Sequence, residues 1–147
     1  VGKFWQTVRQ GPAISLSFGF PELEKTLRYL GTLRPEKGVY GGLGWANYVT
    51  TYFNDMDRLL TMIKRQLKPG AYAIIVVGNS IVQGIEFRVD HLLAQMVEQH
   101  RLFVEDIHIV RTKRVGSSII DSSARNGDGR HQKNRVQLYD AAVILRT

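Results

Sequence analysis

The hydrophobic pattern of the chain centres on the apolar stretch from Ala71 to Val77. It carries no charge and is rich in Ile and Val, which indicates a strand buried on both faces, as in a parallel sheet covered by helices. The turn Gly78-Asn79-Ser80 follows directly, and ligands of open α/β sheets bind outside the carboxyl ends of such strands. We therefore expect Asn79 and Ser80 to lie at a functional site.

Helical periodicity predicts the elements that surround this strand. A long helix should run from Asn47, as its N-cap, to Leu67, and a second from about Glu86 to His100 after a loop over Asn79 to Gly84. A short helix should begin at Pro21 and end near Leu30, where Gly31 closes it. A further short helix is indicated at Lys3 to Arg9.

The remaining strands are predicted at Leu102 to Arg111 and at Val136 to Leu145. The first of these follows a helix, so it should run parallel to the strand at Ala71 to Val77, through a right-handed β-α-β crossover. The segment from Thr112 to Arg135 has no helical period. Without a crossover helix, the last strand should return antiparallel beside its predecessor, as the second arm of a long hairpin.

Four glycines and a proline between Thr32 and Ala46 indicate a loop. The run Gly41-Gly42-Leu43-Gly44 resembles a phosphate-binding loop in composition. Such a loop needs an apolar strand before it, and the preceding Arg34-Pro35-Glu36-Lys37 is no strand, so we favour a surface loop.

Composition sets broader limits. A chain of 147 residues with 44% apolar side chains is expected to form one domain, and it contains no apolar run long enough to cross a membrane and no signal peptide, which predicts a cytoplasmic protein. Cysteine is absent, and the four histidines (His91, His100, His108 and His131) lack paired metal-ligand spacing, so no metal site is expected. The formal net charge of +7 indicates an anionic partner.

Much of the positive charge lies in the predicted hairpin between Thr112 and Arg135. It contains six basic and two acidic side chains, a net +4, and its tip is expected at the same sheet edge as Asn79 and Ser80. We consider both a solvated loop and a phosphate-binding one. The candidate nucleic-acid contacts are Lys113, Arg114, Arg130, Lys133 and Arg135.

A family resemblance rests on the segment Asn54 to Ser80, NDMDRLLTMIKRQLKPGAYAIIVVGNS, followed by a helix, a strand and a long hairpin into YDAAVIL. This order resembles the C-terminal half of an S-adenosylmethionine-dependent methyltransferase, in particular the N6-adenine and N4-cytosine DNA methylases, and covers about Tyr48 to Thr147. It implies an α/β fold with a partial Rossmann-like sheet, in which parallel strands end in a C-terminal antiparallel hairpin and helices cover both faces. It also implies S-adenosylmethionine as cofactor and DNA as partner.

Two family motifs are absent from the chain. No adjacent prolines precede an aromatic residue, so the catalytic tetrapeptide is missing, and no strand leads into the glycine-rich cofactor loop. We therefore expect a fragment whose catalytic residues and most of whose cofactor site lie elsewhere, with Val1 to Ala46 as a variable segment and the missing half of the domain as a partner.

Two functions follow as hypotheses. The first is part of a site-specific DNA methyltransferase, as in restriction-modification systems, inactive by itself. The second is a non-catalytic nucleic-acid-binding or scaffold subunit, and continuation of the reading frame into a Pro-Pro-aromatic motif would distinguish the two. A nicotinamide-dependent enzyme is less favoured, since its fingerprint glycines are missing.

Overall fold

The computed structural model describes residues 5–113 and 136–147. Of Trp5 it describes only the backbone. The chain divides into two compact units, residues 1–62 and residues 63–147. The first is helical and the second contains the main sheet. None of the helices in the described part of the chain combines the length and the apolar character that a membrane span requires.

The first unit consists of α1 (Trp5–Gln10), α2 (Pro21–Thr32), η1 (Pro35–Tyr40) and most of α3 (Gly42–Gln66). Pro21 occupies the first turn of α2, as predicted, because its missing N–H has no helical partner there. The loop predicted over Thr32 to Ala46 is wrong in part, since it contains η1 and the start of α3. Asn47 is therefore inside α3 and caps nothing.

Asn47 instead ties an irregular segment to the side of α3. Its amide accepts a hydrogen bond from Ile14 N at 3.0 Å and donates to the carbonyl oxygens of Val8, Gly11 and Pro12. Asn54, two turns further along, does the same for Ser15 and Ser17. Two asparagines seven residues apart thus satisfy the backbone of a segment that has no secondary structure of its own.

The glycine-rich run serves close packing. A Cβ at Gly42 would lie 1.9 Å from Leu30 O, and one at Gly44 would lie 2.1 Å from Val39 O, so no larger residue fits at either position. The atoms that crowd these glycines are carbonyl oxygens, which would repel a phosphate. Gly42 lets the start of α3 approach the end of α2, and Gly44 lets it approach η1.

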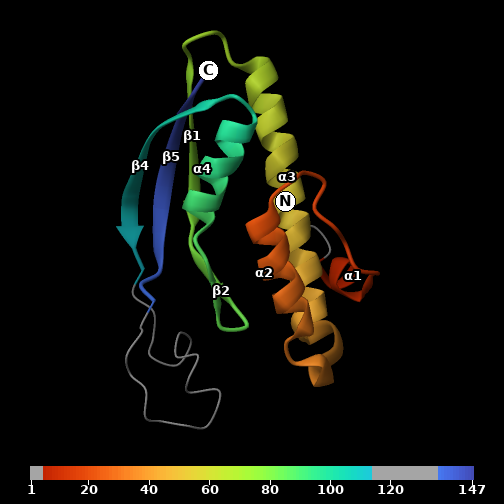
Figure 1. Ribbon diagram of the computed structural model, residues 1–147. Helices are drawn as coiled ribbons and strands as arrows, with labels where there is room; N and C mark the ends of the chain where they lie inside the picture. Colours follow the sequence, from red (N-terminus) through yellow and green to blue (C-terminus); the bar gives the residue numbers. More distant parts are fainter. Residues whose placement is uncertain (1–4, 114–135) are drawn as a thin grey trace. The chain divides into compact units, whose positions relative to one another are not determined.

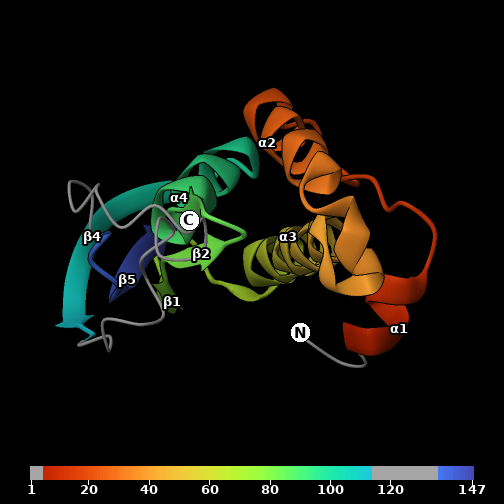
Figure 2. The ribbon, with the colours of Figure 1, turned by 90° about the horizontal axis from the view of Figure 1, so that it is seen from below.

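The second unit contains β1 (Tyr72–Gly78), β2 (Ser80–Val82), β3 (Ile85–Phe87), α4 (Val89–Gln99), β4 (Phe103–Thr112) and β5 (Tyr139–Arg146). The main sheet has the order β1-β5-β4, with β5 between the other two strands, and α4 packs along one face (Figures 1 and 2). Both pairings are antiparallel. The register places Ile75 opposite Val143 and Ile107 opposite the same residue.

This topology corrects the predicted parallel Rossmann-like sheet. β1 and β4 run in the same direction, because both are antiparallel to β5, but β5 separates them, so no parallel pair forms. The predicted antiparallel return of the last strand beside β4 is confirmed. The absence of a helical period in the sequence from Thr112 to Arg135 predicted the direction of β5, but not that it would insert between β1 and β4.

The prediction that β1 is buried on both faces is also wrong. Val77 is buried on the α4 side, whereas Tyr72, Ile74 and Val76 alternate with the covered residues and are 54%, 63% and 61% exposed. Within the described residues of the second unit, α4 packs on one face of the sheet (Figure 2) and no second helix covers the other, contrary to the expected helices on both faces. Below, this second side is called the open face.

A small hairpin replaces the loop predicted at Asn79 to Gly84. Strands β2 and β3 pair antiparallel, and Gln83 and Gly84 both have positive φ at the turn, which is typical of a tight two-residue hairpin. As a result α4 begins at Val89, three residues later than Glu86.

Candidate functional site

Polar side chains gather at the carboxyl ends of β1 and β4. Gly78 of β1 and Arg111 of β4 both register with Asp140 of β5, and Thr112 registers with Tyr139. Successive side chains of a strand point to opposite faces. Tyr139 therefore points toward α4 and Asp140 toward the open face, so two polar clusters form back to back.

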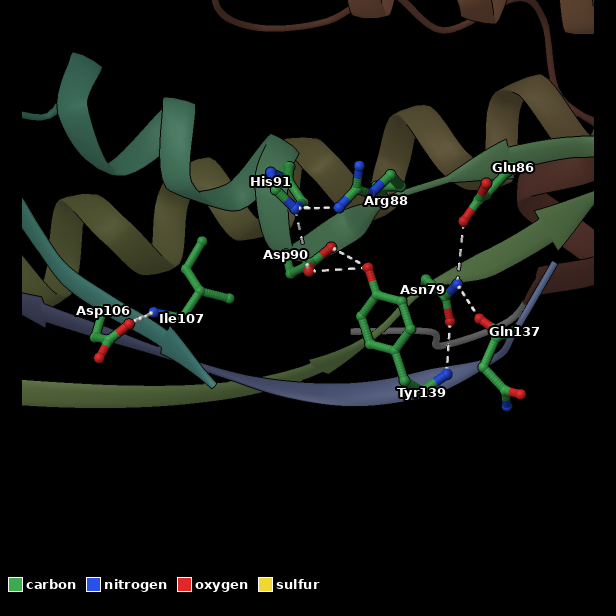
Figure 3. Close-up of polar contacts among 9 residues, drawn as sticks. All are labelled: Asn79, Glu86, Arg88, Asp90, His91, Asp106, Ile107, Gln137 and Tyr139. Atoms are coloured by element: carbon green, nitrogen blue, oxygen red, sulfur yellow. Dashed lines mark hydrogen bonds and ion pairs between the residues drawn. The ribbon is translucent and has the colours of Figure 1, made fainter. Parts of the chain in front are cut away.

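The first cluster, here called the buried network, is built around Asn79, which is 5% exposed. Its side-chain oxygen accepts a hydrogen bond from Tyr139 N at 2.8 Å, and its amide nitrogen donates to Gln137 O at 3.0 Å and to Glu86 Oε1 at 3.2 Å (Figure 3). Its own backbone N–H donates to Tyr139 O. Asn79 thus joins the end of β1 to the start of β5 and to β3.

Tyr139 extends the buried network to the first turn of α4. Its hydroxyl donates toward both carboxylate oxygens of Asp90, at 3.1 and 3.0 Å (Figure 3). Asp90 is 2% exposed and lies where the helix dipole favours a negative charge. Burial raises the pKa of Tyr139 above its usual value, and Asp90 adds to the shift while Arg88 opposes it. The phenol therefore stays protonated at neutral pH.

Four exposed side chains, Ser80, Glu86, Arg88 and His91, lie next to the buried network. Glu86 accepts from Asn79, and Arg88 contacts His91 Nε2, which also lies 3.8 Å from Asp90 Oδ2 (Figure 3). Ser80, which opens β2, is exposed beside them in the chain. Exposed hydrogen-bond donors and acceptors, some positively and some negatively charged, thus form a polar rim around the buried network. This rim can bind a polar ligand, and the buried side chains hold it in place.

The second cluster, here called the charged cluster, lies on the open face. Asp140 accepts from Lys113 Nζ at 2.6 Å on one oxygen and from Arg111 Nη2 at 2.6 Å and Nε at 3.0 Å on the other. Hydrogen bonds from Lys113 and Arg111 lower the pKa of Asp140 below its usual value. Two cations and one anion give the charged cluster a net charge of +1 at neutral pH.

The structure brings three of the predicted site residues to this end of the sheet. Asn79 and Lys113 are engaged by protein partners, and Ser80 is exposed. The other four, Arg114, Arg130, Lys133 and Arg135, lie outside the described residues. Lys113 and Asn79 lie at the same end of the sheet, since Lys113 N donates to Leu138 O and Asn79 N to Tyr139 O, whereas the tip of the predicted hairpin lies outside the described residues.

Sequence reasoning missed the partners that complete both clusters, which are Glu86, Arg88, Asp90, Arg111, Tyr139 and Asp140. One signal was present for Asp140, because an acidic residue in the apolar strand YDAAVIL requires a cationic partner. Nothing in the sequence indicated that Asp90 would be buried against Tyr139.

The first unit contains a hollow of about 570 Å³ between α2, α3 and residues 13–16. Its wall is largely apolar, with Ile14, Leu16, Leu27 and Leu43, and it includes the buried Thr50. The Glu24–Arg28 ion pair, at 3.3 Å, also lines it. The hollow can accommodate a small apolar group, but no residue there indicates which one.

No set of three His, Asp or Glu side chains in the described residues is arranged to hold a metal ion. The described residues also contain no glycine-rich strand-to-helix turn that would hold the methionine part of S-adenosylmethionine. Comparisons with protein families, curated proteins and solved structures find no match to this chain.

Proposed function

We propose that this chain is part of a cytoplasmic site-specific DNA methyltransferase, which transfers a methyl group from S-adenosylmethionine to an exocyclic amino group of adenine or cytosine. The observation that carries the proposal is that exposed Ser80, which follows Asn79, lies at the same end of the sheet as the cations Arg111 and Lys113. There a polar rim for a base and cations for phosphate lie on one polypeptide. The antiparallel last strand agrees with the resemblance in the sequence.

The catalytic and cofactor-binding residues of this function would lie outside the chain, and the missing half of the domain would be its partner. The uncovered edge of β1 supports this partner. Thr147 N and Asn79 N bond to Ala71 O and Tyr139 O, so the odd-numbered residues of β1 face β5. By alternation, the N–H and C=O groups of Ile74 and Val76 point to the opposite edge, where no described strand pairs.

The two edges of the sheet differ in protection. β4 has two register shifts and carries Glu105, Asp106, His108 and Arg111, whereas β1 has neither a shift nor a charge. Charges and bulges prevent edge strands from pairing with other chains. An uncharged edge beside exposed Ile74 and Val76 is expected to be covered in the complete protein.

The function is tested in the full reading frame with labelled S-adenosylmethionine and DNA. We expect the complete protein to transfer methyl groups to DNA. We expect calorimetry of this chain alone to show no micromolar binding of the cofactor. Transfer of label to protein or RNA instead of DNA would refute the substrate assignment.

The uncovered edge is tested in the chain alone by analytical ultracentrifugation. We expect concentration-dependent self-association that the double variant Ile74→Lys/Val76→Lys reduces. The matched control is Ile109→Lys on the protected strand, because Ile109 is 62% exposed, close to the 63% of Ile74. Equal self-association of all three proteins would argue against an incomplete sheet.

The alternative is a non-catalytic nucleic-acid-binding or scaffold subunit. The full engagement of Asn79 by Tyr139, Gln137 and Glu86 favours it, since this amide is not free to read a base. DNA binding without methyl transfer by the complete protein would support this alternative.

A further inference from the structure

The charged cluster has the geometry of an anion site that is already occupied from within. Asp140 presents two oxygens, and three N–H donors of Arg111 and Lys113 reach them at 2.6 to 3.0 Å. A phosphate group offers the same arrangement of oxygens with more negative charge, and arginine binds both groups through paired donors. The carboxylate thus takes the place that a phosphate would take.

Stability does not account for this arrangement. The side chains of Arg111 and Lys113 are 71% and 39% exposed, and ion pairs of exposed side chains contribute little to folding. The cations remain accessible to a ligand, whereas the Asp140 side chain is only 15% exposed.

Gly78 creates the space for the cluster. A Cβ at this position would lie 2.9 Å from Asp140 Oδ1 and 3.1 Å from Lys113 Nζ. Since Gly78 registers directly with Asp140, the lysine amine can reach across β5 only because β1 has no side chain there. Three strands therefore contribute to one site.

We propose that Arg111 and Lys113 form a binding site for a phosphate group, and that Asp140 is an internal competitor that the phosphate must displace. That the phosphate belongs to a nucleic acid rests on the function proposed above. Displacement leaves both cations on the ligand and moves the carboxylate away, so no bond is made or broken covalently. The carboxylate weakens binding of any single phosphate and favours a polyanion with several contacts.

The test compares wild type with Asp140→Asn, using a labelled mixed-sequence DNA duplex and fluorescence anisotropy over a range of salt concentrations. Removing the competing charge should tighten binding at least about fivefold, which is the scale of one close charge at the protein surface. It should also steepen the slope of log affinity against log salt by roughly 1 to 2 units, since each newly contacted phosphate adds about 0.9.

The matched control is Asp106→Asn, which changes the net charge by the same amount as Asp140→Asn and lies in the same sheet. Asp106 is an exposed residue of β4 whose carboxylate pairs with His108 at 2.9 Å, away from the cluster. We expect a much smaller change from it. Equal gains in both variants would overturn the site, because they would reflect net charge alone.

Two further variants test the cations themselves. Arg111→Gln and Lys113→Gln, each in the Asp140→Asn background, should remove the gain in affinity, and thermal unfolding would verify that each variant is folded. DNA binding by wild type with no gain in Asp140→Asn would overturn the internal competitor and leave the proposed function standing.

Inorganic phosphate separates this site from the nucleic-acid function. A phosphate titration of Asp140→Asn, followed by the NMR signal of Arg111 Nε, should give a saturable shift that is weaker in wild type. A shift without DNA binding would support the anion site and count against the nucleic-acid function. No shift and no gain in DNA affinity would overturn the anion site.

Discussion

The two faces of the sheet differ most at its carboxyl end, where neighbouring residues of β5 serve different purposes. Tyr139 points into the buried network and is 9% exposed, while Asp140 points into the charged cluster with two solvent-exposed cations. Strand alternation by itself separates them. The comparison teaches that two successive residues of one strand can hold the sheet together on one face and present charge on the other.

The largest effect is expected from the apolar layer on the α4 face. Leu93 of α4 is fully buried, so Leu93→Ala should lower the free energy of unfolding by about 2–5 kcal/mol through lost burial and a residual cavity. Ile74→Ala on the open face, where Ile74 is 63% exposed, should cost less than about 1 kcal/mol. Urea denaturation followed by circular dichroism measures both, and similar losses would mean that the open face is covered.

The next effect concerns the centre of the buried network. Asn79→Ala removes the acceptor of Tyr139 N and the donor to Gln137 O, and unpaired buried groups cost about 1–3 kcal/mol. The adjacent Ser80→Ala changes an exposed side chain and should stay within about 0.5 kcal/mol. Thermal unfolding of the two variants decides, and a harmless Asn79→Ala would show that Asn79 does not hold β5 in place.

A smaller loss is expected for Tyr139→Phe, about 1–2 kcal/mol, because Asp90 would lose its phenol donor while keeping the favourable helix dipole. The shift in pKa gives this variant a pH signature. Since the folded state raises the pKa of Tyr139, the contribution of Tyr139 to the free energy of unfolding should be complete below about pH 10 and should fall above that pH. The fall above pH 10 should be shallower in Tyr139→Phe. An equal slope in both proteins would exclude Tyr139 as its source.

The smallest effect belongs to the charged cluster and appears only in acid. The folded state lowers the pKa of Asp140, so its contribution is present above the unfolded value of about 3.9 and is lost as pH falls through the folded value. Asp140→Asn should therefore lose less stability than wild type below about pH 4. Acid titrations followed by circular dichroism measure the difference, with Asp106→Asn as the control for a change of one charge.

Much of the secondary structure could be predicted from local chemistry. Pro21 began α2 and the Val/Ile run gave β1, because these signals act within a few residues. The start of α3 and the β2–β3 hairpin were missed, since glycines and a short alternating run give weak local signals. The end of the sheet was expected to be polar, whereas the pairs that organise it, Tyr139 with Asp90 and Asp140 with Arg111, join residues 49 and 29 positions apart.

The sequence by itself determined where most of the strands and helices form, that β5 returns antiparallel to β4, and that positive charge collects in the sequence between those two strands. These follow from periodicity, from the lack of a helical period between Thr112 and Arg135 in the sequence, and from composition. Only the tertiary structure decided that β5 inserts between β1 and β4, which set the partners of Gly78, Asn79 and Asp140 and left one face of β1 open. The reason is that strand order depends on which strand edges form hydrogen bonds, and these edges come from segments far apart in the sequence. The hydrophobic pattern of an apolar strand is the same whichever strand lies beside it.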